Sequence, residues 1–262
     1  MYHSLLIGTE FGENFSLAKN TWTDWYLIPS SRPVINPPDI KTKYVDIPGA
    51  DWHLDLSTVL TGDIAYGSRT GSIDFIVDNG FLSDYKADAW YSVYSTILNH
   101  LHGQLLKCTL EDEPDFYYQG RFSVNSWKSE KTNSKITIDY DLAPYKYERF
   151  SSLEDWEWDT FNFETGIIRE YKDLRVDGTL DMTIIGRRMA VVPSFIVRPD
   201  DGKSTIAVYF NGVKMGDLQP SKQVNGSWTT SRVLGIKTVE GMNKLTFKGK
   251  GYISVDYRGG CL

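Results

Sequence analysis

The chain has 262 residues and a mass of 29.9 kDa, which corresponds to one large domain or two smaller ones. Apolar residues make up 41% of the sequence and charged residues 24%, a globular composition that excludes an intrinsically disordered protein. The net charge of −6 and the isoelectric point near 5.3 exclude a protein that is basic overall and binds nucleic acid through that charge. No stretch approaches the ~18 consecutive apolar residues of a membrane span, and the first residues predict no secretory signal, so we expect no membrane insertion.

The charge is unevenly distributed along the chain. Residues 1–148 hold 12 basic and 20 acidic residues, a net charge of −8, whereas residues 149–262 hold 16 and 14, a net charge of +2. Such an asymmetry indicates two units with different roles. The sequence therefore predicts two domains, 1–148 and 149–262, with a boundary near Pro144–Leu153, where an alternating strand pattern stops.

A proline-rich segment lies in the first domain. Four prolines fall between Pro29 and Pro38, and Pro48 follows. Because proline lacks a backbone donor and resists helix formation, the segment from Pro29 to Pro48 is predicted to be a long extended arm or loop. Long ordered loops usually serve a function. Two interpretations stay open: a surface loop that packs on its own domain, or an arm that reaches a neighbouring subunit.

The remainder of the first half predicts an α+β domain with one helix. The helix is expected from about Asp84 to His102, because apolar residues recur on one face and Gly103 follows as a C-terminal cap. Strands are expected where apolar and polar side chains alternate, joined in hairpins by Glu111–Asp115 and Glu130–Ser134. The apolar positions are Trp90, Tyr94, Ile97, Leu98 and Leu101 on the helix, and Ile73, Phe75, Val77, Phe116, Tyr118, Phe122, Val124, Ile136, Ile138, Tyr140 and Leu142 on the strands.

Short strands at regular spacing, separated by glycine-containing turns, are predicted for the second half. Asn-Gly and Asp-Gly pairs favour tight turns because these residues tolerate positive φ angles. Such a series without a clear helix predicts a β-sandwich or jelly roll, so the whole chain is expected to be mainly β. The expected strands are Leu174–Leu180, Val191–Val197, Ile206–Phe210, Trp228–Leu234, Leu245–Phe247 and Tyr252–Tyr257, and the turn pairs are Asp177-Gly178, Asp201-Gly202, Asn211-Gly212 and Asn225-Gly226.

No sequence motif typical of catalysis, metal binding or cofactor binding is present. The chain lacks HExxH, a CxxC pair and a phosphate-binding glycine loop, and its four histidines all lie in the first half. Cys108 and Cys261 are the only cysteines, which predicts two free thiols in a reducing compartment. We therefore expect no enzyme activity, no catalytic residue, no metal and no cofactor.

Carboxylates and tryptophans interleave at the start of the second half. Aromatic rings stack on sugar rings, and carboxylates bond sugar hydroxyls or catalyse hydrolysis, so Trp156 and Trp158 are candidate carbohydrate-binding residues. A solvated linker anchored by the two tryptophans is the other interpretation. A carbohydrate-binding β-sandwich protein and a glycoside hydrolase thus stay open as alternatives to a structural protein. The carboxylates are Glu154, Asp155, Glu157 and Asp159.

The order of these segments resembles the distal tail protein (Dit) family of long-tailed phages of Gram-positive bacteria. The resemblance covers nearly the whole chain and is structural, with no catalytic motif. A proline-rich arm, a strand, a helix, a hairpin with an acidic turn and a closing strand follow one another in the family's order. The matching segments are Trp25–Pro38, Gly71–Val77, Tyr94–Gln104, Leu105–Val124, Ser134–Glu148 and Tyr252–Gly260.

The resemblance implies a homohexameric ring at the distal end of the tail of a phage, prophage or tail-like particle. The N-terminal domains would form the ring, and a galectin-like C-terminal β-sandwich would project outward. The implied partners are the major tail tube protein, a tail-associated lysin or fibre-base protein, and receptor-binding proteins.

The implied location is the virion, after synthesis in the cytoplasm of the bacterial host. DNA would cross the channel of the ring without specific binding, which suits the acidic first half because like charges repel phosphate. The second half contains no histidine, so it lacks the histidine-centred sugar motif of galectins.

Overall fold

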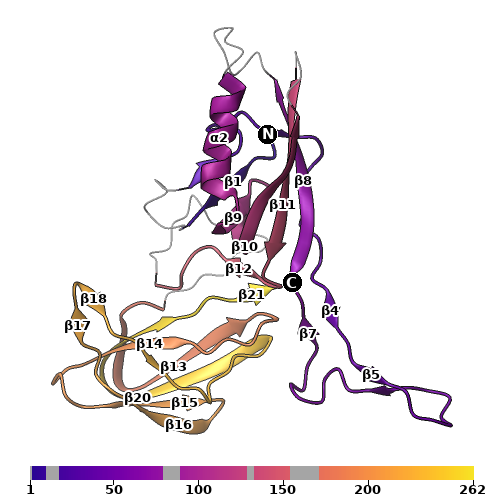
Figure 1. Cartoon of the computed structure of the whole chain (residues 1–262). Coiled ribbons are helices and arrows are strands. Elements are labelled where there is room, and N and C mark those ends of the chain that lie inside the picture. The colour runs from indigo at the N-terminus through magenta and orange to yellow at the C-terminus, as the bar shows by residue number, and fades with distance from the viewer. Residues whose placement is uncertain (1, 10–17, 79–88, 129–132, 154–170) are drawn as a thin grey trace. The chain divides into compact units, whose positions relative to one another are not determined.

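The computed structural model describes residues 2–9, 18–78, 89–128, 133–153 and 171–262 (Figure 1). The chain divides into two compact units, Met1–Arg149 together with Leu262, and Phe150–Cys261. Each unit has its own cluster of buried apolar side chains. The fold is mainly β, as predicted, and the described residues contain one helix.

The first unit is built on an antiparallel sheet. Its strands lie in the order β2-β1-β9-β10-β11-β8-β3, and β12 pairs with β10 beside this path. The predicted meander is confirmed, because β9, β10 and β11 are consecutive and hydrogen-bonded neighbours. The strands are β1 (Leu5–Gly8), β2 (Lys19–Asn20), β3 (Ile28–Pro29), β8 (Arg69–Asp78), β9 (Leu105–Leu110), β10 (Glu113–Lys128), β11 (Asn133–Leu142) and β12 (Lys146–Glu148).

Alternation along β11 explains why this sheet has one apolar face. Ile136, Ile138, Tyr140 and Leu142 are buried, while the residues between them are exposed or half-buried. Successive side chains of a strand point to opposite faces, so the alternating sequence buries one face. The prediction for this strand is confirmed residue by residue.

The helix α2 (Ala89–Leu101) packs on the apolar face of the sheet. Trp90, Ile97 and Leu101 are buried in the same cluster as Phe75 and Phe122 of the strands. Gly103, two residues after the last residue of the helix, has φ +75°, which confirms the predicted cap. The predicted start at Asp84 lies outside the described residues.

Two short ladders extend the first unit beyond the start of β8. The ladder β4 (Ile40–Lys41) with β7 (Ala65–Tyr66) is followed by the ladder β5 (Tyr44–Val45) with β6 (Leu54–Asp55). Figure 1 shows them as a narrow two-stranded segment that continues past the sheet. We call residues 39–67 the arm; its ends are joined by the bond from the Gly67 amide to the Asp39 carbonyl, 2.7 Å long.

The arm begins later than the predicted segment Pro29–Pro48. Ile28 and Pro29 pair with β8, and Ile35 belongs to the buried core, so the first proline-rich residues lie against their own sheet. Proline indicates extended backbone but does not reveal what that backbone packs against. The first interpretation holds for the part up to Asn36, which packs on its own unit. The chain departs from that unit after Pro38, and contact of this later part with a neighbouring subunit stays a prediction.

The second unit contains a six-stranded antiparallel sheet in its described residues. The order is β16-β15-β20-β14-β19, and β13 pairs with β20 along its whole length. A two-stranded ladder of β17 and β18 accompanies it. The strands are β13 (Leu174–Gly186), β14 (Ser194–Pro199), β15 (Ile206–Phe210), β16 (Val213–Leu218), β17 (Gln223–Val224), β18 (Ser227–Trp228), β19 (Ser231–Arg232), β20 (Gly241–Asp256) and β21 (Gly260–Cys261).

Glycine pairs play two roles in this unit. The Asn211-Gly212 and Asn225-Gly226 turns are confirmed, since both residues of each pair have positive φ and connect hairpin strands. The Asp177-Gly178 turn is wrong, because Gly178 lies within β13 and opposite Gly249 of β20. The two strands predicted at Leu245–Phe247 and Tyr252–Tyr257 belong to one long strand, β20, which ends at Asp256. Gly249 and Gly251 lie between them within this strand, because a glycine can occupy a strand as well as a turn.

Candidate assembly surface

Arg69 anchors the arm at the point where it returns to the sheet. Its Nε donates a hydrogen bond to the carbonyl of Pro144 at 2.8 Å, and its Nη1 donates to the carbonyl of Asn36 at 2.9 Å. The side chain is buried, and its guanidinium carbon lies 5.6 Å from the ring centroid of Tyr118. Burial lowers the pKa of Arg69, but an arginine pKa is high enough for the group to stay charged. The buried guanidinium of Arg69, just after the arm, is thus bonded both to Asn36, just before the arm, and to Pro144, which follows β11.

Asn36 completes this anchor on the other side of the arm. Its amide donates to the hydroxyl oxygen of Tyr140 at 3.0 Å, and its side-chain nitrogen donates to the carbonyl of Thr70 at 2.8 Å. Gly71 leaves room for this arrangement. A Cβ at Gly71 would lie 2.4 Å from the Tyr140 hydroxyl oxygen and 2.7 Å from the Asn36 side-chain nitrogen.

A Gly71→Ala substitution should therefore destabilise the first unit by about 1–3 kcal/mol, the usual cost of inserting a methyl group into a packed site. Tyr140 and Asn36 must move apart to accept it. Chemical denaturation measures the change in the free energy of unfolding. Ser72→Ala, at the exposed next position, is the control and should change that energy by at most ~0.5 kcal/mol. Equal stability of the two variants would contradict the packing described.

The arm exposes apolar side chains along its whole length. No residue of the arm is buried. Leu60 is 97% exposed and Trp52 76%, values unusual for such large side chains. Contiguous exposed apolar surface marks a site of interaction with another molecule. The exposed apolar residues are Ile40, Tyr44, Val45, Ile47, Trp52, Leu54, Val59, Leu60 and Ile64.

Local contacts hold the outer part of the arm in one conformation. The His53 ring stacks on Trp52 with centroids 4.7 Å apart and meets the Tyr44 ring edge-on at 4.2 Å. Ser57 accepts a hydrogen bond from the Lys43 amide at 2.9 Å and donates its own amide to Asp55 at 2.8 Å. A two-stranded ribbon is marginally stable alone in water. These local contacts therefore add to the little stability that the two short ladders have by themselves.

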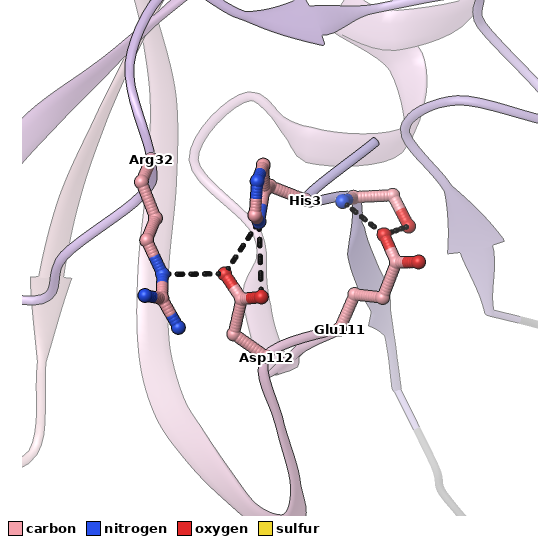
Figure 2. Close-up of polar contacts among 5 residues, drawn as sticks. His3, Arg32, Glu111 and Asp112 are labelled. Atoms are coloured by element: carbon pink, nitrogen blue, oxygen red, sulfur yellow. Dashed lines mark hydrogen bonds and ion pairs between the residues drawn. The ribbon is translucent and has the colours of Figure 1, made fainter. Parts of the chain in front are cut away.

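A polar cluster ties the N-terminal residues to the turn between β9 and β10 (Figure 2). Asp112 contacts His3 Nδ1 with both carboxylate oxygens, at 2.9 and 2.8 Å, and accepts a hydrogen bond from Arg32 Nε at 3.1 Å. Glu111 accepts bonds from the amide and the hydroxyl of Ser4 at 2.8 and 3.1 Å. Burial of Asp112 opposes ionisation, but the bonds and charges of His3 and Arg32 outweigh it and hold the pKa of Asp112 below its ordinary value.

Asp112→Asn should lower the free energy of unfolding by about 1 kcal/mol at neutral pH. Because the folded-state pKa lies below the unfolded value of about 3.9, this contribution is present above that pH and is lost as the pH falls through the folded-state pKa. Denaturation of both proteins between pH 7 and pH 2 measures the difference. Asp115→Asn controls for the loss of one carboxylate. A difference that stays constant down to pH 2 would contradict this role.

The second unit presents a row of cations and aromatic rings on the outer face of its sheet. Arg175 and Arg198 lie opposite Tyr252 on the two strands beside it, with guanidinium carbons 5.0 and 5.6 Å from its ring centroid. Arg198 also lies 5.7 Å from the ring of Trp228. Asp200 accepts two bonds from Arg175, at 2.6 and 2.8 Å, which hold the pKa of Asp200 below its ordinary value. This face is polar and internally paired, in contrast to the arm.

The predicted carbohydrate-binding residues are not among those that the structure describes. Trp156 and Trp158 lie outside the described residues, as do Glu154, Asp155, Glu157 and Asp159. In the part of the chain that the structure describes, no group of three His, Cys, Asp or Glu side chains is placed to hold a metal ion. Within the same residues, no helix is both long enough and apolar enough to cross a membrane. Cys108 is a buried free thiol whose pKa is raised by burial, as expected of an inert core cysteine.

Comparison with solved structures identifies the fold. No protein-family model and no curated protein matches the sequence. The structure is similar, however, to the crystal structure of SPP1 Dit (gp 19.1), described as a paradigm of the hub adsorption apparatus in phages that infect Gram-positive bacteria. The similarity covers 98% of this chain and 99% of that chain, with a TM-score of 0.61 and 12% sequence identity. This chain has the Dit fold.

This chain and SPP1 Dit share a fold although few of their residues are identical. At 12% identity, the predicted resemblance is confirmed through the order and arrangement of the elements. The functional residues must therefore be read from this chain itself. Sequence reasoning missed the apolar residues of the arm, although one signal was present: residues 44–66 combine many apolar residues with four aspartates and no lysine or arginine.

Proposed function

We propose that this chain is a structural hub protein at the distal end of the tail of a long-tailed phage, prophage or tail-like particle. The similarity to SPP1 Dit, a hub protein, across 98% of this chain carries the proposal. A match along nearly the full length of both chains means that both units of this chain have counterparts in the hub protein. The hub joins the tail tube to the baseplate or host-adhesion apparatus and performs no catalysis.

The first unit forms the ring in this proposal, and six copies close it. The ring-forming domain corresponds to residues 1–148, and residues 149–262 form a galectin-like β-sandwich directed outward. A cyclic ring needs interfaces in which one patch meets a different patch on the next copy. The exposed apolar arm supports such an interface, because it offers a surface that its own unit does not cover.

The remaining partners follow from the position of a hub. The ring contacts the major tail tube protein on one side and a tail-associated lysin or fibre-base protein on the other, and receptor-binding proteins attach outside it. DNA crosses the channel without specific binding, which the net charge of −8 in residues 1–148 favours. The protein is made in the cytoplasm of the bacterial host and acts in the virion.

Negative-stain imaging of the purified chain tests the proposal. The expected result is a population of rings, single or stacked back to back, whose rotational averages have six-fold symmetry and a central channel. Averages with another symmetry, or particles without a channel, would contradict a hexameric hub.

A carbohydrate-binding protein is the second candidate. Tyr252 and Trp228 are partly exposed beside Arg175, Arg198 and Asp200, and such aromatic and polar groups suit a sugar. A glycan array probed with the full chain tests it. Binding that is lost in Tyr252→Ala would favour this candidate, and an array without binding would leave the hub as the function.

A further inference from the structure

A second exposed aromatic surface lies in the first unit, away from the arm. Tyr91 and Tyr94 of α2 contact Trp127 of β10, with ring centroids 5.7 and 4.5 Å apart. Tyr91 is 53% exposed and Trp127 39%. We call these three residues the aromatic patch. Tyrosine and tryptophan are enriched at the centres of protein interfaces, where they contribute most of the binding energy.

The arm and the aromatic patch lie at opposite ends of the same sheet. Arg69, where the arm joins β8, pairs with Leu142 of β11, whereas Trp127 pairs with Ile136, which in turn pairs with Phe75. Six residues of β8 separate the two levels, about 20 Å along an extended strand. Figure 1 shows the arm continuing away from the sheet at the end opposite the first turn of α2. The arm of one chain therefore cannot cover the patch of the same chain.

The charges of the two surfaces are complementary. Residues 44–66 of the arm carry Asp46, Asp51, Asp55 and Asp63 and no lysine or arginine. At the end of the sheet that holds the patch, Lys128 and Lys135 lie directly opposite each other on β10 and β11, and both are exposed. The outer arm is thus acidic and apolar, and the aromatic patch has cations beside it; complementary charges of this kind orient two partners during association.

We infer that the outer part of the arm docks on the aromatic patch of a neighbouring copy of this chain. The partner is a second copy because both surfaces are exposed in every chain and neither can reach the other within one chain. Such an interface is heterologous, since each copy offers its arm to one neighbour and its patch to the other, and rings close through interfaces of this kind. The inference rests on the proposed ring and names the surfaces that close it.

Two double variants of the full chain test the docking. Trp52→Ala with Leu60→Ala removes the most exposed apolar side chains of the arm, and Tyr91→Ala with Trp127→Ala removes the patch. All four residues are exposed, and thermal unfolding checks that each variant keeps its fold. Mass photometry should find each double variant monomeric under conditions in which the wild-type chain forms rings. The control, Leu234→Ala with Met242→Ala, removes two strongly exposed apolar residues of the second unit and should leave the rings unchanged.

An equimolar mixture of the two double variants is the decisive sample. The patch-deficient chain still has an arm, and the arm-deficient chain still has a patch, so one interface forms and both outer surfaces of the pair are defective. The expected product is a heterodimer that grows no further. Two monomeric variants without a heterodimer, or a variant that still forms rings, would overturn the docking. If the wild-type chain and both double variants form the same rings, the proposed hub stands and the docking is wrong. If the wild-type chain never self-associates, both the hub and the docking are wrong.

Discussion

A chain with a shortened arm is expected to keep its fold and lose its ring. Lys41 and Ala65 are directly paired in the β4–β7 ladder, so an Asn-Gly pair in place of residues 42–64 makes a two-residue hairpin turn there. No removed residue is buried, so we expect the free energy of unfolding to change by less than about 1 kcal/mol. The ring should be absent, because the exposed apolar surface that we propose joins one copy to the next is gone. Chemical denaturation and negative-stain imaging measure the two outcomes.

The matched control for the shortened chain is Pro48→Asn, which retains the whole arm and places an Asn-Gly pair at its Pro48-Gly49 turn. Gly49 has φ +83°, so the new pair suits the turn that is already there. This variant should form rings like the wild type. Rings of normal size from the shortened chain would mean that assembly does not use the arm. An unfolded shortened chain would mean that the arm belongs to the core, contrary to its exposure.

Arg69→Met is expected to have the largest effect on stability among single substitutions at the arm. It removes the donors to the Pro144 and Asn36 carbonyls, and hydrogen bonds from a charged group contribute about 1.5–3 kcal/mol each. Methionine fills part of the volume, and the guanidinium no longer has to be desolvated, so we expect a net loss of about 2–4 kcal/mol. Arg69→Lys keeps the charge but lacks the planar guanidinium, so its free energy of unfolding should lie between those of the wild type and Arg69→Met. Urea denaturation measures all three proteins.

Arg121→Met is the matched control, because Arg121 also donates to a carbonyl, that of Gly103 at 2.7 Å, from an exposed position. Its expected cost is at most about 0.5–1 kcal/mol. If both methionine variants lost the same stability, the burial of Arg69 would contribute nothing to its role. Rings should also be fewer in Arg69→Met even where the unit stays folded, because the arm would no longer have a fixed base.

Strict alternation made parts of the fold predictable from sequence. The β11 strand places an apolar residue at every second position from Ile136 to Leu142, and the helix repeats its apolar residues every three or four positions, so each pattern corresponds to one element. The second unit was harder. Glycine at Gly178 suggested a turn, but it lies in β13 opposite another glycine, Gly249, and no local pattern distinguishes these two uses.

The candidate surface was less predictable than the fold. Apolar residues in the arm carry no period, and an apolar residue in a sequence normally indicates core, so the exposure of Trp52 and Leu60 was signalled only by the aspartates around them. Arg69 gave no sign of its role either, since its partner carbonyl on Pro144 is 75 positions away. The prolines indicated that an extended segment exists, but its departure from the sheet after Pro38 depends on tertiary contacts of Ile35 and Asn36.

The mass of the full chain in solution tests the hub most directly. Mass photometry over a range of concentrations should find a dominant species of six times 29.9 kDa, or twice that mass for rings that stack in pairs. The shortened-arm chain, measured alongside, should remain at the mass of one chain. A full-length chain that stays monomeric at every concentration, or a dominant assembly that is not a multiple of six, would contradict the hexameric hub.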